Sequence, residues 1–274
     1  MNLSIAAALV MGIVLLALTV FRDIGATMIF NVDAFSIVIG GTAVAMFVGF
    51  PVQRIRDTFQ DIVNSFSDQR KRDDIIRDIL EISRMHRRAD IRNLESRIQG
   101  MDDNFLRLGA NLLINDHEQK EIITILEREM MLRRINCNLS QNVLKTIARL
   151  TPSFGLAGTV ISLIKMFKHL ESVDSIAPLM AVALMSTFYG VIIANLFMLP
   201  LCAKLKEKAI MDETNMHITI EGILAIKNRE HPLKIEESLL GFQGFSESSL
   251  ADNGPAQIVP KTARLMYWLQ KVRA

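Results

Sequence analysis

The sequence predicts an all-α membrane protein: four transmembrane helices, with a cytoplasmic helical domain inserted between the second and the third. Three observations predict this fold. Half of the 274 residues are hydrophobic, long uncharged runs recur along the chain, and a charged segment of about a hundred residues separates the second run from the third. A bilayer span needs about 20 predominantly apolar residues.

Residues 1–53 are predicted to hold the first two spans. No charged side chain lies between Met1 and Phe21, or between Ala34 and Gln53. The first run has no basic segment ahead of it and no small-residue cleavage site. We therefore interpret it as a retained span and not as a signal peptide.

Residues 54–145 are predicted to form the cytoplasmic helical domain. The stretches "IRDILEIS" (76–83) and "EIITILEREMMLRRI" (121–135) repeat apolar residues at helical spacing. Glycine is sparse in this segment. We expect some of these helices to continue into the spans without a break.

Residues 146–203 are predicted to hold the third and fourth spans. The stretch "TPSFGLAGTVISLI" (151–164) lies between Arg149 and Lys165, and is short for a span. Its flanking basic side chains can reach the membrane surface and so extend its usable length. The fourth span follows in the uncharged run from Ser175 to Ala203.

Two further segments complete the chain. Residues 204–242 are predicted to be a cytoplasmic helical segment, which includes "IEGILAIKN". Residues 243–274 combine a Ser-, Gly- and Pro-rich linker with the basic amphipathic stretch "KTARLMYWLQKVRA". That stretch either lies on the membrane surface or is a poorly ordered tail.

Basic residues close to the spans predict the orientation in the membrane. The residues on one side are Arg54, Arg56, Arg133, Arg134, Lys145, Arg149, Lys204, Lys206 and Lys208. The short loops on the other side carry only Arg22, Lys165 and Lys168. The insert and both termini are therefore predicted to be cytoplasmic.

Small side chains recur every three or four residues in the last two spans. The residues are Pro152, Gly155, Thr159 and Ser162 in the third span, and Ala183, Ser186 or Thr187, Gly190 and Ala194 in the fourth. Small residues mark the faces on which membrane helices approach each other. Either these stripes pack the spans of one chain together, or they line a surface for a separate partner helix. In the second case the hydroxyls of Thr159, Ser186 and Thr187 lie beside the partner's working group.

Two prolines lie near the predicted cytoplasmic ends of these spans. Pro152 and Pro200 each remove a backbone donor and can kink a helix. Each marks either a hinge or a plain helix boundary.

The predicted spans contain no Asp, Glu or His at membrane depth. Ion and proton carriers normally place an ionisable residue there. If the protein handles ions, the titrating carboxylate must therefore come from another chain. The sequence also shows no catalytic arrangement, phosphate-binding loop or metal-ligand cluster, and its five histidines are scattered. We expect no enzyme activity and no bound cofactor or metal. The net charge of +2 gives no indication of nucleic-acid binding.

The order of segments resembles the MotA/PomA family, the larger subunit of the bacterial flagellar stator. The motifs that carry the resemblance are "TPSFGLAGTVISLIKMF", "IAPLMAVALMSTFYGVIIANLFMLPLCAKL", "EGILAIKNREHPLKIEESLLGF" and "LESRIQGMDDNFLRLGANLLINDHEQKEI". The resemblance covers the chain from near Met1 to about Phe242. It implies a multi-pass protein of the bacterial inner membrane, in which five copies surround two copies of a MotB/PomB-type partner.

By this resemblance, the partner supplies a transmembrane aspartate, and cation passage turns the pentamer so that its cytoplasmic domains push on a rotor switch protein. One charge that crosses the membrane releases about 2.3 kcal/mol per 100 mV, which is several times RT. This energy is large enough to bias a mechanical step.

The resemblance also assigns individual residues. Pro152 and Pro200 match the two prolines of the family's mechanism, and Thr159 and Thr187 match hydroxyl positions that face the partner aspartate. Ser186 occupies a position that is Thr in some sodium-driven members, so of Na⁺ and H⁺ we favour sodium. The neighbourhood that contacts the rotor contains Arg88, Arg92, Glu95, Arg97 and Asp103.

Two other classes compete with this interpretation. An energiser of envelope transport, of the ExbB/TolQ type, has three spans and a different placement of the insert; the two spans before the insert argue against it. A solute transporter is expected to show inverted repeats and a midplane binding site, and the sequence shows neither.

Overall fold

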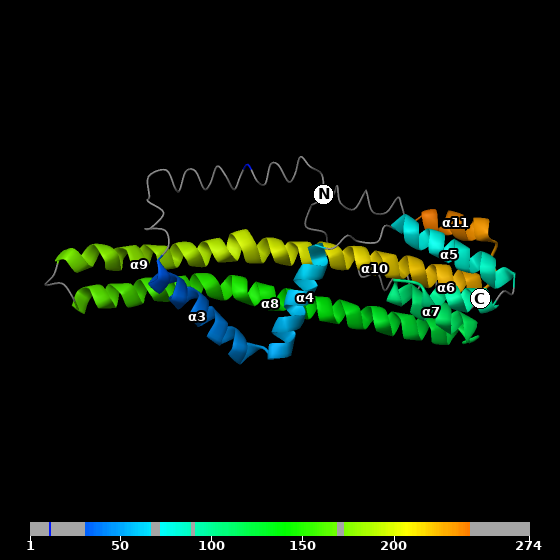
Figure 1. The fold of residues 1–274 in the computed structure, drawn as a ribbon, viewed down its shortest axis with the longest axis horizontal. Coiled ribbons are helices and arrows are strands. Elements are labelled where there is room, and N and C mark those ends of the chain that lie inside the picture. The colour runs from blue at the N-terminus through cyan, green and yellow to red at the C-terminus, as the bar shows by residue number, and fades with distance from the viewer. Residues whose placement is uncertain (1–10, 12–30, 67–71, 89–90, 169–172, 242–274) are drawn as a thin grey trace, which may run out of the picture. The chain divides into compact units, whose positions relative to one another are not determined.

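The computed structural model describes residue 11 and residues 31–66, 72–88, 91–168 and 173–241 (Figure 1). Every element in this part of the chain is helical, so the predicted all-α class is confirmed. Except for Met11, the first predicted span lies outside the described residues, as does the tail 243–274. The elements are α3 (Val32–Gly49), α4 (Val52–Phe66), α5 (Arg72–Arg87), α6 (Ile91–Gln99), α7 (Asn104–Ile114), α8 (Gln119–Lys168), α9 (Val173–Ile192), the π-helix η1 (Ile193–Met198), α10 (Leu199–Lys227) and α11 (Pro232–Leu240).

Three stretches of helix in the described residues are long and apolar enough to cross a membrane. They are Val32–Gly49, Gln119–Lys168 and Ile176–Lys227. These stretches contain the predicted second, third and fourth spans. The 50-residue α8 runs from the predicted insert into the predicted third span without a break, as the sequence leads one to expect.

The chain divides into two compact units. Unit 1 comprises Met1–Gln69 and Glu127–Thr214, and unit 2 comprises Arg70–Leu126 and Asn215–Ala274. α8 and α10 contribute residues to both units.

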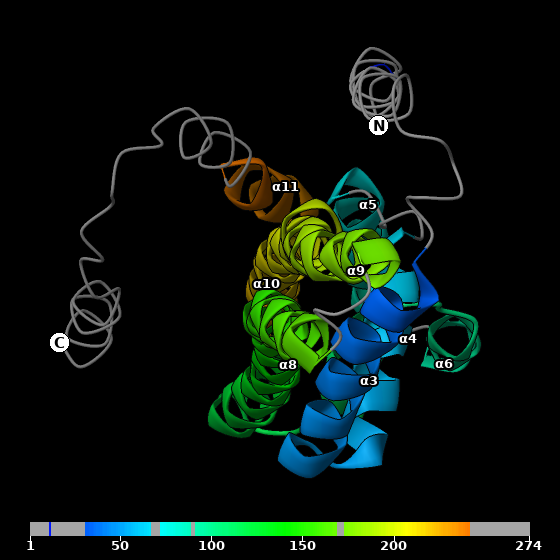
Figure 2. The same cartoon turned by 90° about the vertical axis from the view of Figure 1, so that its left-hand side faces the viewer.

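In unit 1, α3 lies beside α8 and α9 (Figures 1 and 2). The backbone N–H of Asn31 donates to the Tyr189 hydroxyl on α9 at 2.9 Å. The rings of Phe35 and Tyr189 meet edge to face, with 6.0 Å between their centroids. On the α8 side, Gly41 leaves room for the ring of Phe154, which a β-carbon at Gly41 would strike. The predicted second span is thus fixed against the last two.

Unit 2 is built around apolar side chains that all its helices contribute. Fully buried members are Ile79, Ile82, Leu94, Ile98, Leu106, Ile122, Leu126, Ile223 and Ile235. Two glycines allow close approach within this core. A β-carbon on Gly222 would lie 2.7 Å from Ile79, and one on Gly109 would lie 3.0 Å from Ile223.

Two helices of unit 2 end in the left-handed backbone conformation at residues that are not glycine. Asp116, after α7, has φ 55°, and Arg229, after α10, has φ 54°. The N–H of Glu230 donates back to the carbonyl of Ala225 at 3.0 Å, the bond that closes a Schellman C-terminus. The Nζ of Lys227 donates to Oδ1 of Asp116 at 2.6 Å, and this hydrogen bond holds the pKa of Asp116 below its usual value. Burial, assisted by the positive charge of Arg229, lowers the pKa of the nearby His86.

Replacing Arg229 with glycine should stabilise unit 2. The left-handed conformation costs a residue with a β-carbon about 1–2 kcal/mol, and part of that gain is offset because glycine makes the unfolded chain more flexible. We expect Arg229→Gly to raise the free energy of unfolding by about 0.5–1 kcal/mol, measured by far-UV circular dichroism of the detergent-solubilised chain in denaturant. The neighbouring Asn228→Gly is the control and should not stabilise. Equal effects of both substitutions would contradict the assigned backbone strain.

Candidate functional site

α8 and α9 approach each other most closely at glycines on both helices. A β-carbon on Gly155 of α8 would lie 2.8 Å from the carbonyl oxygen of Ser186. One on Gly190 of α9 would lie 2.6 Å from the carbonyl oxygen of Thr151 and 3.0 Å from Cα of Pro152. Real β-carbons do not approach other atoms so closely, so only glycine fits at either position. The two helices therefore touch backbone to backbone.

Ser186 lies at the centre of this contact. Its side chain is fully buried, and its hydroxyl donates to the carbonyl of Val182 at 2.8 Å. A β-carbon on Gly158 would lie 2.6 Å from the hydroxyl oxygen of Ser186. Gly155 and Gly158 thus accommodate one serine between them.

The hydroxyl and glycine residues that the sequence assigns to the ion pathway fall into two groups. Gly155, Ser162, Ser186 and Gly190 are buried within the chain itself. For Gly155, Ser186 and Gly190, packing within one chain describes what the structure shows. Thr159 and Thr187 are only half-buried, so their side chains retain surface that a second chain can contact.

Ser162 differs from the other buried hydroxyls on these helices. Its side chain is 1% exposed, and none of the described residues is a hydrogen-bond partner of its Oγ. Thr151, by contrast, is equally buried and donates to the carbonyl of Ile147 at 3.1 Å.

Pro152 lies inside α8, which continues to Lys168. A plain helix boundary at this residue is therefore excluded. A proline has no N–H to give to the carbonyl four residues earlier, so the hydrogen-bond ladder has a gap at this point. The gap lies where Gly190 of α9 meets the α8 backbone.

Pro200 follows a π-helical stretch in the fourth span. η1 covers Ile193–Met198 between α9 and α10, and Pro200 is the second residue of α10. A π-turn is the wider helical turn found where the regular ladder is interrupted. The missing N–H of Pro200 provides such an interruption, and here too the helix continues past the proline.

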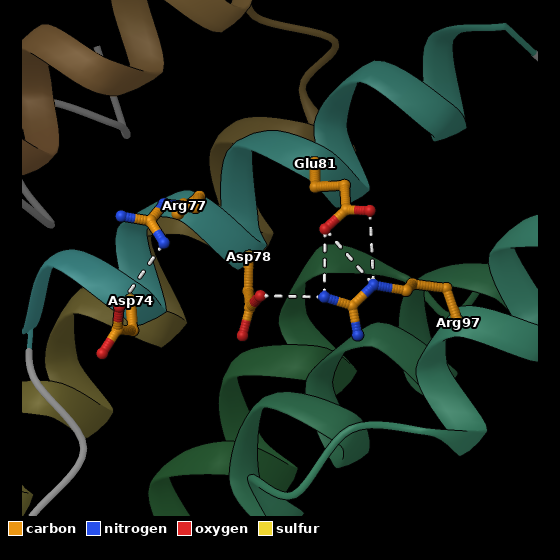
Figure 3. Close-up of polar contacts among 5 residues, drawn as sticks. All are labelled: Asp74, Arg77, Asp78, Glu81 and Arg97. Atoms are coloured by element: carbon orange, nitrogen blue, oxygen red, sulfur yellow. Dashed lines mark hydrogen bonds and ion pairs between the residues drawn. The ribbon is translucent and has the colours of Figure 1, made fainter.

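In unit 2, Arg97 of α6 binds two acidic side chains of α5 (Figure 3). Its Nε lies 3.2 Å and its Nη2 3.1 Å from Oε2 of Glu81, and its Nη2 lies 3.2 Å from Oδ1 of Asp78. Asp78 is only 9% exposed. The hydrogen bond with Glu81 raises the pKa of Arg97 above its ordinary value. This ion pair joins α5 to α6.

The other charged residues predicted to meet the rotor occupy different positions. Asp103 caps the N-terminus of α7, where its Oδ1 accepts from the N–H groups of Phe105 at 2.8 Å and Leu106 at 3.2 Å. Arg88, Arg92 and Glu95 are exposed. Arg97 and Asp103 thus have roles within unit 2, while Arg88, Arg92 and Glu95 are open to a partner.

Comparison with known proteins identifies the family. The model of the MotA/TolQ/ExbB proton channel family matches residues 97–217. Motility protein A of Treponema pallidum (strain Nichols) is 30% identical over 216 residues, which are 78% of this chain and 83% of the relative. Motility protein A of Aquifex aeolicus (strain VF5) is 32% identical over 216 residues, which are 77% of this chain and 84% of the relative.

The chain belongs to the MotA/TolQ/ExbB proton channel family. This is a family of membrane channel proteins and not of enzymes, so the chain is a non-enzymatic protein of the inner membrane. The C. jejuni MotAB structure superimposes with a TM-score of 0.78 at 20% identity, covering 88% of this chain and 96% of that one. The fold of this MotA/TolQ/ExbB member is therefore that of MotAB.

Sequence reasoning missed two contributors to the helix contact. Gly158 and Thr151 lie on the face of α8 that meets α9, yet the predicted stripe passed through Pro152 and Thr159 instead. The spacing Gly155–Gly158 was the available signal, because two small residues three apart share one helix face. The ion pair of Arg97 left no signal in the sequence, since its partners lie 16 and 19 residues away.

A methyl group at the α8–α9 contact should destabilise the protein. We expect Gly155→Ala and Gly190→Ala each to lower the free energy of unfolding by about 1–3 kcal/mol, because a β-carbon must push the backbones apart. Gly40→Ala on α3 is the matched control, since nothing lies within 4 Å of a β-carbon there. Thermal unfolding of the detergent-solubilised chain measures the difference. Equal melting temperatures for all three variants would contradict the close contact.

Removing the Arg97 guanidinium should weaken unit 2. We expect Arg97→Met to cost about 1–2 kcal/mol, since Asp78 loses a charged partner while the exposure of Arg97 and Glu81 screens the pair. Arg92→Met on the same helix is the control and should unfold like the unmodified protein, because Arg92 is exposed. Chemical denaturation followed by circular dichroism gives both values. A loss at Arg92 as large as that at Arg97 would show that the Arg97 ion pair is not specific.

Proposed function

We propose that the chain is the larger subunit of a bacterial flagellar stator, which couples cation influx to torque on the rotor. In this proposal, five copies surround two copies of a MotB/PomB-type partner that contributes one helix with an aspartate. The names of the relatives, Motility protein A, and the fold shared with MotAB support the flagellar assignment.

One observation carries the mechanism. α8 and α9 form a tight, neutral helix pair, and it leaves Thr159 and Thr187 half-exposed while the predicted spans contain no Asp, Glu or His at membrane depth. A neutral hydroxyl can accept a cation's charge at low desolvation cost, but it cannot release and rebind a proton as a carboxylate does. The titrating group therefore has to come from the partner helix, which passes Thr159 and Thr187.

The membrane arrangement follows from the same elements. We place α3, the apolar part of α8, and α9 with η1 and the start of α10 in the bilayer, together with a first span in residues 1–21. The basic residues near these spans put the insert, residues 204–242, and both termini in the cytoplasm. There the exposed Arg88, Arg92 and Glu95 of unit 2 can meet an oppositely charged rotor switch protein.

The coupling ion in this proposal is sodium. Because Ser186 is buried in the contact between α8 and α9, the oxygens offered to the ion are those of Thr159 and Thr187. Neutral oxygens can replace part of a hydration shell, as carbonyl oxygens do in ion channels.

Replacing Thr187 with valine should stop ion passage without disturbing the fold. Valine keeps the shape and removes the oxygen, and loss of a bond to a charged group costs about 1.5–3 kcal/mol, or roughly a tenfold to hundredfold lower rate. Uptake of sodium and of protons is measured separately in vesicles that contain the chain and a MotB/PomB-type partner.

Two controls accompany this measurement. Vesicles with the chain alone should take up neither ion, and Thr146→Val should leave uptake unchanged because that hydroxyl bonds only the carbonyl of Asn142 in its own helix. Conduction by the chain alone would overturn the proposed source of the carboxylate. Proton uptake without sodium uptake would overturn the choice of ion.

A further inference from the structure

α4 has the opposite pattern to a helix that packs into its own protein. Its buried side chains are Thr58 and Ser65. Four large apolar side chains are exposed instead: Val52 at 66%, Phe59 at 62%, Val63 at 70% and Phe66 at 62%. Spacings of seven, four and three residues place these four on one face of the helix. We call this face the α4 stripe.

Polar contacts fix α4 across the paired segments of α8 and α10 within unit 1 (Figures 1 and 2). Ser140 on α8 donates to Oδ2 of Asp61 at 2.6 Å, and Nζ of Lys208 on α10 donates to the carbonyl of Asn64 at 2.7 Å. The Nζ of Lys204 lies 3.5 Å from the centroid of the Phe66 ring. Since α8 and α9 run along the membrane normal in the arrangement proposed above, α4 lies close to the membrane plane.

These contacts also set the depth of α4. Only Phe50 and Pro51 separate α4 from the apolar α3. Lys204 directly follows the uncharged run that ends at Ala203, and Lys208 lies four residues, or about 6 Å, further along the helix. The headgroup layer on each side of a bilayer is about 5–8 Å thick. α4 therefore lies at the level of the headgroups.

The charges around α4 are mainly positive. The basic residues are Arg54 and Arg56 on α4, Lys145 and Arg149 on α8, and Lys204, Lys206 and Lys208 on α10. The acidic residues at this level are Asp57, Asp61 and Glu207, and two of them accept hydrogen bonds, from Gln53 and Ser140. Each Lys or Arg near a membrane surface favours anionic lipid by about fivefold.

We propose that α4 is an interfacial helix that lies on a bilayer containing anionic phospholipids. The α4 stripe inserts among the acyl chains, and the surrounding basic side chains bind the lipid phosphates. A helix of this kind needs an apolar face toward lipid and polar contacts toward its own protein, which is the distribution α4 shows. The inference rests on the membrane arrangement of the proposed function.

Spin labels on the full-length chain test the position of α4. Single cysteines replace Val63 on the α4 stripe, Gln60 on its polar face, and Leu184 on α9, in a background in which Cys137 and Cys202 are changed to serine. The chain is placed in phosphatidylcholine vesicles with and without phosphatidylglycerol. Collisions of each label with oxygen, which dissolves in lipid, and with a water-soluble nickel chelate report its surroundings. We expect the Val63 label to meet oxygen and the Gln60 label to meet nickel.

Each other result has a defined meaning. A Val63 label reached by nickel lies in water, and one shielded from both reagents is covered by a second copy or by residues 1–30; either result overturns the proposal. If nickel also reaches the Leu184 label, which should lie in the acyl region, the proposed membrane arrangement fails, and the inference with it. The Leu184 label thus separates failure of the arrangement from failure of the inference alone.

A second measurement tests the lipid charge. Adding phosphatidylglycerol should raise the fraction of chains whose Val63 label is immersed. The double variant Arg56→Gln, Lys206→Gln should need roughly 25-fold more favourable conditions to reach the same ratio of immersed to released label. A matched variant, Arg77→Gln on α5, removes a basic residue of unit 2 and should behave as the unmodified chain. Immersion that does not depend on phosphatidylglycerol would overturn the role of anionic lipid.

Discussion

The backbone contact between α8 and α9 is the constraint on which the rest of unit 1 depends. Lipid provides no hydrophobic force to hold two apolar helices together, so close packing has to do it. Gly155 and Gly190 allow that packing because any β-carbon would strike the opposite backbone. Once the helices are locked on this face, the neighbouring faces are decided as well: Ser186 is enclosed, while Thr159 and Thr187 keep exposed surface.

The same contact coincides with two interruptions of the backbone ladder. Pro152 lies where Gly190 approaches α8, and the π-helix η1 begins three residues after Gly190. Helix bending concentrates where hydrogen bonds are missing. The helix pair is thus held firmly side by side but is easiest to bend next to its contact, a combination that suits a subunit proposed to move against a partner helix.

Charges do different work in the two units. In unit 2, Arg97 and Asp103 hold helices in place, through an ion pair and a helix cap, so exposure and not charge distinguishes Arg88, Arg92 and Glu95 as surface available to a partner. In unit 1, basic side chains surround α4, whose apolar face is open. There the positive charge and the apolar stripe together describe a lipid surface better than either does alone.

The sequence by itself determined the helical class, the second, third and fourth apolar segments, and the unbroken passage from the insert into the third span. Each of these follows from local periodicity and from the length of apolar runs, which a chain carries without knowledge of its neighbours. Even the need for a carboxylate from another chain follows from composition alone.

Only the tertiary structure decided which side of each stripe is used. Pro152, Gly155, Thr159 and Ser162 are similar in size and spacing, but a rotation of less than one residue about the helix axis decides which of them meets α9. That rotation is set by long-range contacts, such as those of Gly41 with Phe154 and Asn31 with Tyr189. Arg97 was assigned to a partner for the same reason, because its partners, Asp78 and Glu81, come close only after α5 and α6 pack together.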